Sequence, residues 1–195
     1  YKMKQIKVID MTLANRAESL SFKEKIETAR QLDRLGVSVI DLPEIVNITT
    51  DSLLVRTIAA FLKNSVISVC AGMSEQGIET AAAALSSAKN ARVKISIPVS
   101  AVKMEYVCHK KPDKILELAK TLFALATQKF SDVEFFAEDA TRAETAFLEQ
   151  IIGEAVSAGV KTVTLCDDEG AILPDEFADL LAIYTEGQEV KDIDG

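Results

Sequence analysis

The chain has 195 residues, of which 48% are hydrophobic and 27% charged, with a formal net charge of −8. This composition is typical of a globular protein that can bury a core of its own. The acidic balance excludes electrostatic attraction to nucleic acid or to an anionic membrane surface, and no apolar run approaches the roughly 20 residues of a membrane span. Because no basic, apolar leader is visible at the N-terminus, we expect a cytoplasmic protein.

Strand and helix patterns alternate along the whole chain. Short runs rich in β-branched residues predict strands at Gln5–Asp10, Val37–Leu42, Ser65–Cys70, Arg92–Pro98, Asp132–Phe136 and Thr162–Cys166. Between the runs, apolar residues recur three and four positions apart, which predicts helices near Phe22–Leu35, Asp51–Leu62, Glu75–Lys89, Pro112–Thr127, Ala143–Ala158 and Pro174–Tyr184. The alternation therefore indicates repeated βα units.

Residues typical of helix ends support these bounds. Ser21 directly precedes the first long helix, and Asp113 lies near the start of the fourth, where such side chains cap free N–H groups. Gly36 and Gly159 each follow a helix and precede a strand, the usual place for a helix stop. By contrast, the segment Ser100–Lys111 is predicted to be the longest connection, a loop lying over the strand ends.

Strict βαβ alternation implies a parallel sheet with right-handed crossovers, and the scarcity of polar residues in the strands fits a sheet covered on both faces. We expect an α/β fold of the (β/α) TIM-barrel type, forming a single domain over residues 1–195. Six units are visible, while a closed eight-unit barrel takes about 250 residues. The tail Glu186–Gly195 offers only a weak strand at Glu189–Ile193. Because an open sheet leaves two unpaired edges, we expect an incomplete or partner-completed barrel, a sheet that closes or packs differently, or a truncated larger protein.

The cysteines and the histidine give little chemistry. Cys70, Cys108 and Cys166 are an odd number without close spacing, which favours reduced thiols over disulfides. His109 is the one histidine of the sequence and cannot form a two-histidine metal site. Cys166 has no histidine close in sequence to act as its base, so we interpret it as an inert thiol.

Several segments in a fixed order carry a family resemblance. They are Val8–Glu18, Leu20–Ile26, Ala29–Val37, Val39–Asp41, Met104–Tyr106, Val133–Arg142 and Asp167–Phe177. Together they resemble the metal-dependent condensing enzymes and lyases related to 2-isopropylmalate synthase, homocitrate synthase and hydroxymethylglutaryl-CoA (HMG-CoA) lyase, whose signature is D-T-T-L-R-D-G-E-Q. The resemblance implies a TIM barrel that joins an acyl-CoA to a 2-oxo acid, or runs the reverse cleavage, with a divalent metal at the strand ends.

The chain departs from this pattern at the positions to which the resemblance assigns catalytic or binding roles. Ala14 stands where the family has an enolate-polarising Arg, and Asn15 where it has a metal-binding Asp. Lys94 stands at a His position, and Asp168 at a Thr that grips the substrate carboxylate. A neutral amide is a weaker ligand than a carboxylate, and the family's later His-x-His pair is absent from the 195 residues. We therefore expect no metal site and no cofactor, unless residues outside this sequence restore the site.

Side-chain alternation along the strands places Lys94, Ser96 and Glu134 on the face away from the helices. Other acids follow the strands, at the end where active sites form in such folds. We interpret Lys94 and Glu138 as candidate catalytic residues. The candidate substrate-binding residues are Asp10, Asp41, Asp167, Asp168 and Arg142. These acids could alternatively hold a cation or cap the helices that follow them.

Two pairings remain as local interpretations. Lys94 is either a Schiff-base nucleophile or one half of a buried ion pair with Glu134. Glu138 and Arg142 are four residues apart, which predicts a local ion pair.

Three functions remain open. The first is a 2-isopropylmalate or homocitrate synthase-like protein whose metal-dependent chemistry is lost or altered. The second is a non-catalytic scaffold or subunit, in a homo-oligomer or completed by another chain. The third is a metal-independent aldolase that uses Lys94. A 2-oxo acid or an acyl-CoA is the expected ligand, with no nucleic-acid and no membrane partner.

Overall fold

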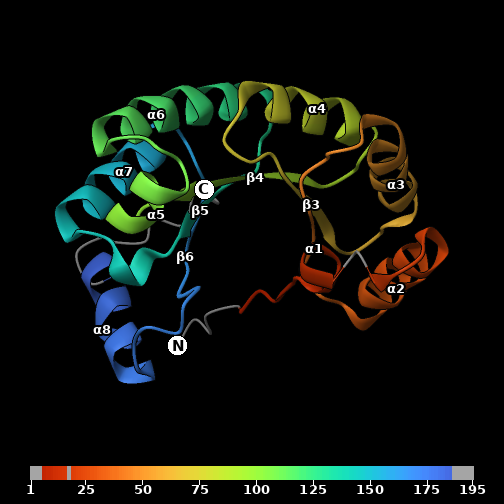
Figure 1. Ribbon diagram of the computed structural model, residues 1–195. Coiled ribbons are helices and arrows are strands. Elements are labelled where there is room, and N and C mark those ends of the chain that lie inside the picture. The colour runs from red at the N-terminus through yellow and green to blue at the C-terminus, as the bar shows by residue number, and fades with distance from the viewer. Residues whose placement is uncertain (1–5, 17–18, 186–195) are drawn as a thin grey trace.

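A computed structural model of the chain describes residues 6–16 and 19–185. Its six strands are all parallel and follow one another in sequence order across one sheet. They are β1 Ile9–Asp10, β2 Val39–Leu42, β3 Val66–Cys70, β4 Ala91–Pro98, β5 Val133–Glu138 and β6 Thr162–Leu165. Figure 1 shows the sheet curled into an arc, with the long helices along its convex side. The predicted fold class, an incomplete (β/α) barrel, is confirmed.

Each strand is followed by at least one helix. The helical segments are α1 Thr12–Arg16, α2 Phe22–Leu35, α3 Ile48–Phe61, α4 Glu75–Leu85, α5 Ala101–Tyr106, α6 Pro112–Lys129, η2 Ala140–Arg142, α7 Thr145–Ser157 and α8 Pro174–Thr185. Within the described residues, no helix is long and apolar enough to cross a membrane. The long helices lie close to the predicted ranges, and α2 has the predicted bounds.

Capping residues set the helix bounds. The Ser21 side chain accepts the Glu24 N–H, and the Glu24 carboxylate accepts the Ser21 N–H, a reciprocal arrangement that starts α2. Gly36 ends α2 with a left-handed φ of 86°, a conformation that costs a glycine little. The helix α3 begins at Ile48, earlier than predicted, because the Asn47 side chain accepts two N–H groups of its first turn.

Three short segments differ from the prediction. The predicted loop Ser100–Lys111 contains the helix α5, which Ser100 caps by accepting the Lys103 N–H. The helices α1 and η2 were not predicted, because five and three residues are too short to show a helical period. The edge strand β1 covers only Ile9–Asp10. The predicted strand at Glu189–Ile193 lies outside the described residues.

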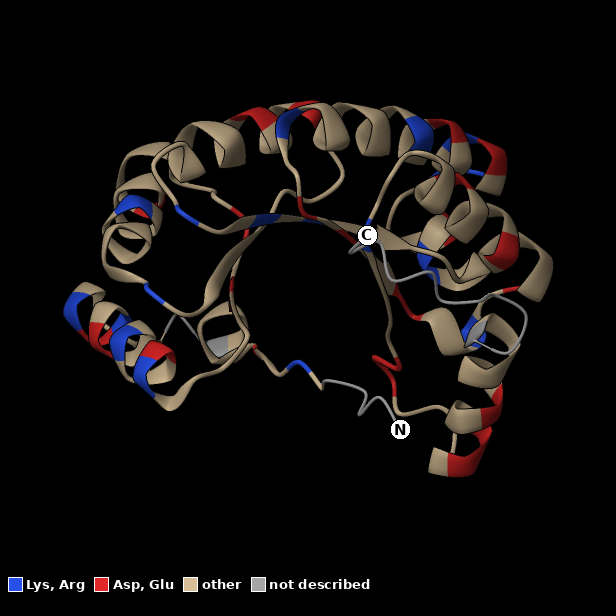
Figure 2. Cartoon of the chain, turned by 180° about the vertical axis from the view of Figure 1, so that it is seen from behind, with Lys and Arg blue, Asp and Glu red and all other residues tan. Residues whose placement is uncertain are grey.

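The core lies between the sheet and the outer helices. On β4 the side chains of Val93, Ile95 and Ile97 are fully buried, and the next strand contributes Phe135, whose ring packs edge-to-face on Phe123 of α6 with centroids 5.1 Å apart. The alternate residues of β4 face the concave side. In Figure 2, blue and red segments interrupt the strands of the arc and the loops at their ends. Charged residues therefore lie on the strands themselves as well as in the loops that follow them.

Candidate functional site

The concave face of the sheet carries polar side chains on successive strands. Asp41 of β2, Ser68 of β3, Lys94 of β4 and Glu134 of β5 are all buried, and Thr164 of β6 is half-buried. A buried charge is tolerated only when it is paired and hydrogen-bonded. The partners of these charges therefore decide what the face can do.

Lys94 forms a buried ion pair with Asp41. Its ammonium contacts Oδ2 of Asp41, while the other carboxylate oxygen accepts a hydrogen bond of 2.8 Å from Ser68 Oγ. The ammonium also lies 4.8 Å from the ring centroid of Phe136, a cation–π contact. Four strands thus fix one positive charge near the carboxyl end of the sheet.

The predicted Lys94–Glu134 ion pair is wrong. The two residues are opposite each other in the sheet register, but Glu134 receives NH1 of Arg92 at 3.4 Å and Thr164 Oγ1 at 2.6 Å. Arg92 lies two residues before Lys94 on the same strand face, and its longer side chain binds the Glu134 carboxylate. The sequence interpretation missed this second basic residue.

A recess opens beyond Lys94 at the carboxyl ends of the strands. Its volume is about 450 Å³, and it is lined by Met11, Ala14, Asn15, Pro43, Glu44, Cys70, Lys94, Lys103, Phe136, Glu138 and Asp168. Three predicted site residues, Lys94, Glu138 and Asp168, therefore line one recess. Lys103 of α5 was not predicted, because its segment was interpreted as a loop. This end of the sheet is where (β/α) barrels place their active sites.

An adjoining pocket is smaller and more apolar. Its volume is about 290 Å³, and it shares Ala14, Asn15, Pro43 and Glu44 with the recess. Its apolar lining consists of Leu13, Leu42, Ile45, Val46, Leu54 and Val55, and two charged residues, Lys25 and Asp51, also line it. A ligand with one charged end and one aliphatic end matches this pair of hollows.

Four other predicted residues do not line the recess. Asp41 reaches it only through Lys94. The carboxylate of Asp10 accepts the backbone N–H of Thr12 at 3.0 Å and so caps α1. Asp167 accepts Thr141 Oγ1 at 2.8 Å and the Ala171 N–H at 2.9 Å, which holds the turn after β6. The alternative interpretation of these acids, as caps and turn residues, fits Asp10 and Asp167.

Arg142 binds Asp139, so the predicted Glu138–Arg142 ion pair is wrong. Nε of Arg142 donates to Asp139 at 2.8 Å, and Glu169 lies 3.8 Å away from its NH2. Glu138 instead accepts Ser96 Oγ at 2.5 Å. The pair fails because η2 is a 3₁₀ turn, which brings residues three apart together, whereas a pair four apart needs an α-helix.

Several pKa values in and around the recess are shifted. Burial opposes the charge on Asp139, but hydrogen bonds from Arg142 and Ser100 outweigh it and lower its pKa. Burial likewise opposes the charge on Lys103, but the hydrogen bond to Asp168 outweighs it and raises the pKa of the ammonium. For Cys166, burial and then the charges of Asp168 and Glu138 raise the pKa to about 12. A thiol with so high a pKa is a poor nucleophile, consistent with an inert residue.

The donors at this end of the sheet do not fit a divalent metal. Among residues 6–16 and 19–185, no three His, Cys, Asp or Glu side chains gather closely enough to hold one. Asn15 offers a neutral amide, Asp10 is engaged by Thr12, and the ammonium of Lys94 shares the recess.

Parallel βα units curled into an arc, with a charged recess at the strand ends, define a protein of the (β/α)-barrel class. The family model described as HMGL-like matches residues 6–192. The chain therefore belongs to the HMGL-like family, as the motifs predicted.

Named relatives and solved structures agree with this assignment. The 2-isopropylmalate synthases of Shouchella clausii and Heliobacterium modesticaldum are 36% and 35% identical over 98% and 94% of this chain. The chain spans only 38% and 37% of their lengths. The HMG-CoA lyases of Bacillus subtilis and Brucella melitensis superpose with TM-scores of 0.75 and 0.72 at 14% and 15% identity. They cover 94% and 92% of this chain, which spans 64% and 67% of theirs. These two likenesses show the fold.

Proposed function

We propose that this chain is a 2-isopropylmalate synthase-like protein that binds a small 2-oxo acid in the strand-end recess without the family's metal. One observation carries the proposal. The buried ammonium of Lys94, held by Asp41 and Phe136, lines the recess where the family resemblance places a divalent cation. The names of the relatives, at 36% and 35% identity, support the choice of ligand class.

The chemistry of Lys94 suits a 2-oxo acid. Such a molecule presents a carboxylate and a neighbouring carbonyl oxygen, both hydrogen-bond acceptors. An ammonium has three donors, of which Asp41 takes one. A donor directed into the recess would hold the ligand and polarise its carbonyl group. The adjoining apolar pocket would accept an aliphatic side chain, so a branched 2-oxo acid such as 2-oxoisovalerate is the preferred ligand.

The second half of a condensation has less support at this site. Forming an enolate from an acyl-CoA requires a positive group beside the developing charge. Ala14 lines the recess at the position where the family has that Arg, and its methyl group supplies no charge. We therefore expect residues 1–195 to turn over acyl-CoA weakly or not at all. Binding of the 2-oxo acid should not depend on Ala14.

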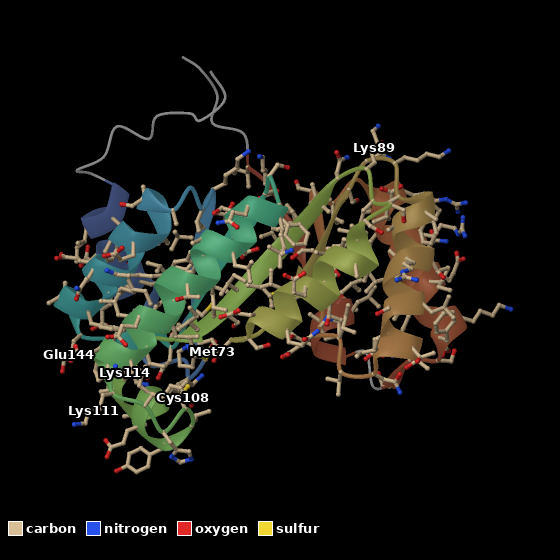
Figure 3. All side chains as sticks on the ribbon, turned by 90° about the horizontal axis from the view of Figure 1, so that it is seen from above. Met73, Lys89, Cys108, Lys111, Lys114 and Glu144 are labelled. Carbon is tan, nitrogen blue, oxygen red and sulfur yellow. The ribbon has the colours of Figure 1, made fainter. Side chains whose placement is uncertain are left out.

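Calorimetry tests the proposal. We expect 2-oxoisovalerate to bind the purified chain in the absence of Mg²⁺, Mn²⁺ and Zn²⁺, and binding to be lost in the Lys94→Met, Asp41→Asn double variant. The double change avoids leaving Asp41 buried and unpaired. Lys89→Met is the matched control, because Lys89 is exposed and precedes the amino end of β4, far from α5 in Figure 3.

A parallel assay measures thiol release from acetyl-CoA with the same acid. Binding that requires a divalent metal, together with metal-dependent thiol release, would overturn the proposal in favour of the usual family chemistry. No binding and no release would overturn it in favour of a scaffold or subunit.

The aldolase is a second candidate, because Lys94 places an amine in the recess. Only a neutral amine attacks a carbonyl carbon, whereas the ammonium makes the ion pair with Asp41. The pair must open before any Schiff base forms, so the geometry favours binding. Borohydride treatment with 2-oxoisovalerate distinguishes the two, since a reduced adduct on Lys94 would establish the aldolase-type step.

A further inference from the structure

Two hydrogen-bond donors converge on one carboxylate oxygen at the recess. Oδ2 of Asp168 accepts the ammonium of Lys103 at 2.7 Å and the backbone N–H of Asp139 at 2.9 Å. The donors come from α5 and from Asp139, directly after β5, while Asp168 follows β6. A cation and an N–H aimed at one point form a typical binding pair for a carboxylate.

The backbone of both donor-bearing segments is held in place by contacts that do not involve Asp168. Ser100 Oγ accepts the Lys103 N–H at 3.2 Å and donates to the carboxylate of Asp139. Asp139 is fully buried with a left-handed φ of 58°, and Arg142 donates to the same carboxylate. Ser100 therefore joins both donor-bearing segments, which fixes the Asp139 N–H and the backbone of Lys103 from which the ammonium extends.

The charges around the recess leave no cation unmatched within its lining. Lys94 is paired with Asp41 and Lys103 with Asp168, while the carboxylates of Glu44 and Glu138 also line the recess. Asp168 lies on a turn with its side chain 28% exposed, so its carboxylate can leave while the donors stay. Once it leaves, Lys103 has its ammonium free toward the recess that it lines.

We propose that Asp168 is an internal competitor, whose carboxylate fills a second carboxylate-binding site formed by Lys103 and the Asp139 N–H. A small carboxylate from solution binds there by displacing Asp168. The contact is thus autoinhibitory, and it releases α5 from the turn after β6 when a ligand arrives. The proposal rests on the proposed function only for its ligand class, small carboxylic acids.

Removal of the competitor tests the site. We expect Asp168→Ala to bind acetate at least about tenfold more tightly than the unchanged chain, since a charge-assisted hydrogen bond becomes available. The gain should vanish in the Lys103→Met, Asp168→Ala double variant. Acetate binding is measured by calorimetry at low ionic strength, because this partly exposed pair is screened by salt.

Glu169→Ala is the matched control. It removes the same charge from the same turn, but Glu169 contacts only Arg142 at 3.8 Å among the ion pairs of the described residues. A gain of equal size in Glu169→Ala, or one that survives the loss of Lys103, would overturn the proposal. So would no gain in Asp168→Ala when circular dichroism shows a folded protein.

Asp168→Asn is a milder variant for the case in which Asp168→Ala does not fold. Its neutral oxygen still fits between the donors but binds them more weakly, so a smaller gain in acetate affinity is expected. No gain would contradict the proposal.

The two proposals fail separately. If Asp168→Ala binds acetate more tightly but the binding of 2-oxoisovalerate does not depend on Lys94, the function proposed above is wrong and the proposal of an internal competitor is supported. If the binding of 2-oxoisovalerate requires Lys94 but Asp168→Ala does not bind acetate more tightly, the proposal of an internal competitor is wrong and the proposed function is supported.

Discussion

Single buried carboxylates hold separate segments of this chain together. Asp33, near the end of α2, is 6% exposed and accepts the backbone N–H groups of Asn64 and Ser65 at 2.9 Å. Burial opposes its charge, but these hydrogen bonds and one from Lys63 outweigh it and lower the pKa of Asp33. The side chain thereby joins α2 to the segment that precedes β3.

Asp33→Asn should lower the free energy of unfolding by about 1–3 kcal/mol at neutral pH, because an amide is a poorer acceptor for three N–H groups. A lowered folded-state pKa contributes stability that is complete above the unfolded value, near 3.8, and is lost as the pH falls through the folded value. The difference between the two proteins should therefore narrow below about pH 4. Urea unfolding at pH 7 and pH 3.5 measures it.

Glu27→Gln is the control for this comparison, since its side chain is 57% exposed and sits on the same helix. It should change stability by less than about 0.5 kcal/mol. A difference for Asp33→Asn that stays constant with pH would contradict the assignment of a charged, hydrogen-bonded carboxylate.

At the residue scale, the sequence predicts which face a side chain occupies but not which partner it takes. Alternation along β4 placed Lys94 on the concave face, where the structure has it. The choice of Asp41 over Glu134 depends on competition with Arg92 and on the position of a strand 53 residues away. Such contacts between distant segments leave no local pattern. Lys103 was missed for the related reason that α5 is too short to show a period.

The helices contact the sheet closely enough that a single methyl group matters. A Cβ on Gly77, in the first turn of α4, would lie 2.1 Å from the carbonyl oxygen of Ala71, just after β3. A Cβ on Gly153, within α7, would meet nothing within 4 Å. Of these two glycines, only Gly77 is needed for a close approach between a helix and the residue that follows a strand.

Gly77→Ala should destabilise the protein by about 1–3 kcal/mol, because the backbone of α4 or Ala71 must move. Gly153→Ala should stabilise it by up to about 1 kcal/mol, since alanine loses less backbone entropy in a helix. Midpoints of urea unfolding for the two variants and the unchanged chain give both signs. Equal effects at the two positions would show that α4 does not pack on Ala71 as described.

At the element scale, long periodic segments were predictable and short ones were not. The helix α2 was predicted to its ends because Ser21, Glu24 and Gly36 mark them. The strand β1 was overestimated, since Ile6 and Val8 resemble strand residues but are 86% and 56% exposed. An edge strand with one neighbour can be apolar in sequence and still pair over only two residues.

At the scale of the whole molecule, the sheet is unequally supported along the arc. The strand β4 pairs on both sides, with β3 and with β5, and its apolar face is fully covered by helices. Among residues 6–16 and 19–185, the strand β1 pairs only with β2, through Ile9 and Asp10, and all four residues of β6 are half-buried. Within the described residues, β1 and β6 each have one neighbour, so the two ends of the arc are the places for a further strand or a partner.

Hydrogen exchange should follow this gradient. Amide protons of β3, β4 and β5 should exchange slowest, through global unfolding, while those of β1 and α8 exchange fastest, through local opening.

The measurement is hydrogen exchange followed by mass spectrometry at two protein concentrations, tenfold apart. Fast exchange at β1 and β6 that does not change with protein concentration would mean that no second copy of the chain covers these strands. Slower exchange at these two strands only, at the higher concentration, would mean that a second copy covers the edges, because partner binding stabilises the strands it pairs with by mass action. Fast exchange in β4 would contradict the described pairing itself, because β4 is paired on both sides and its apolar face is buried.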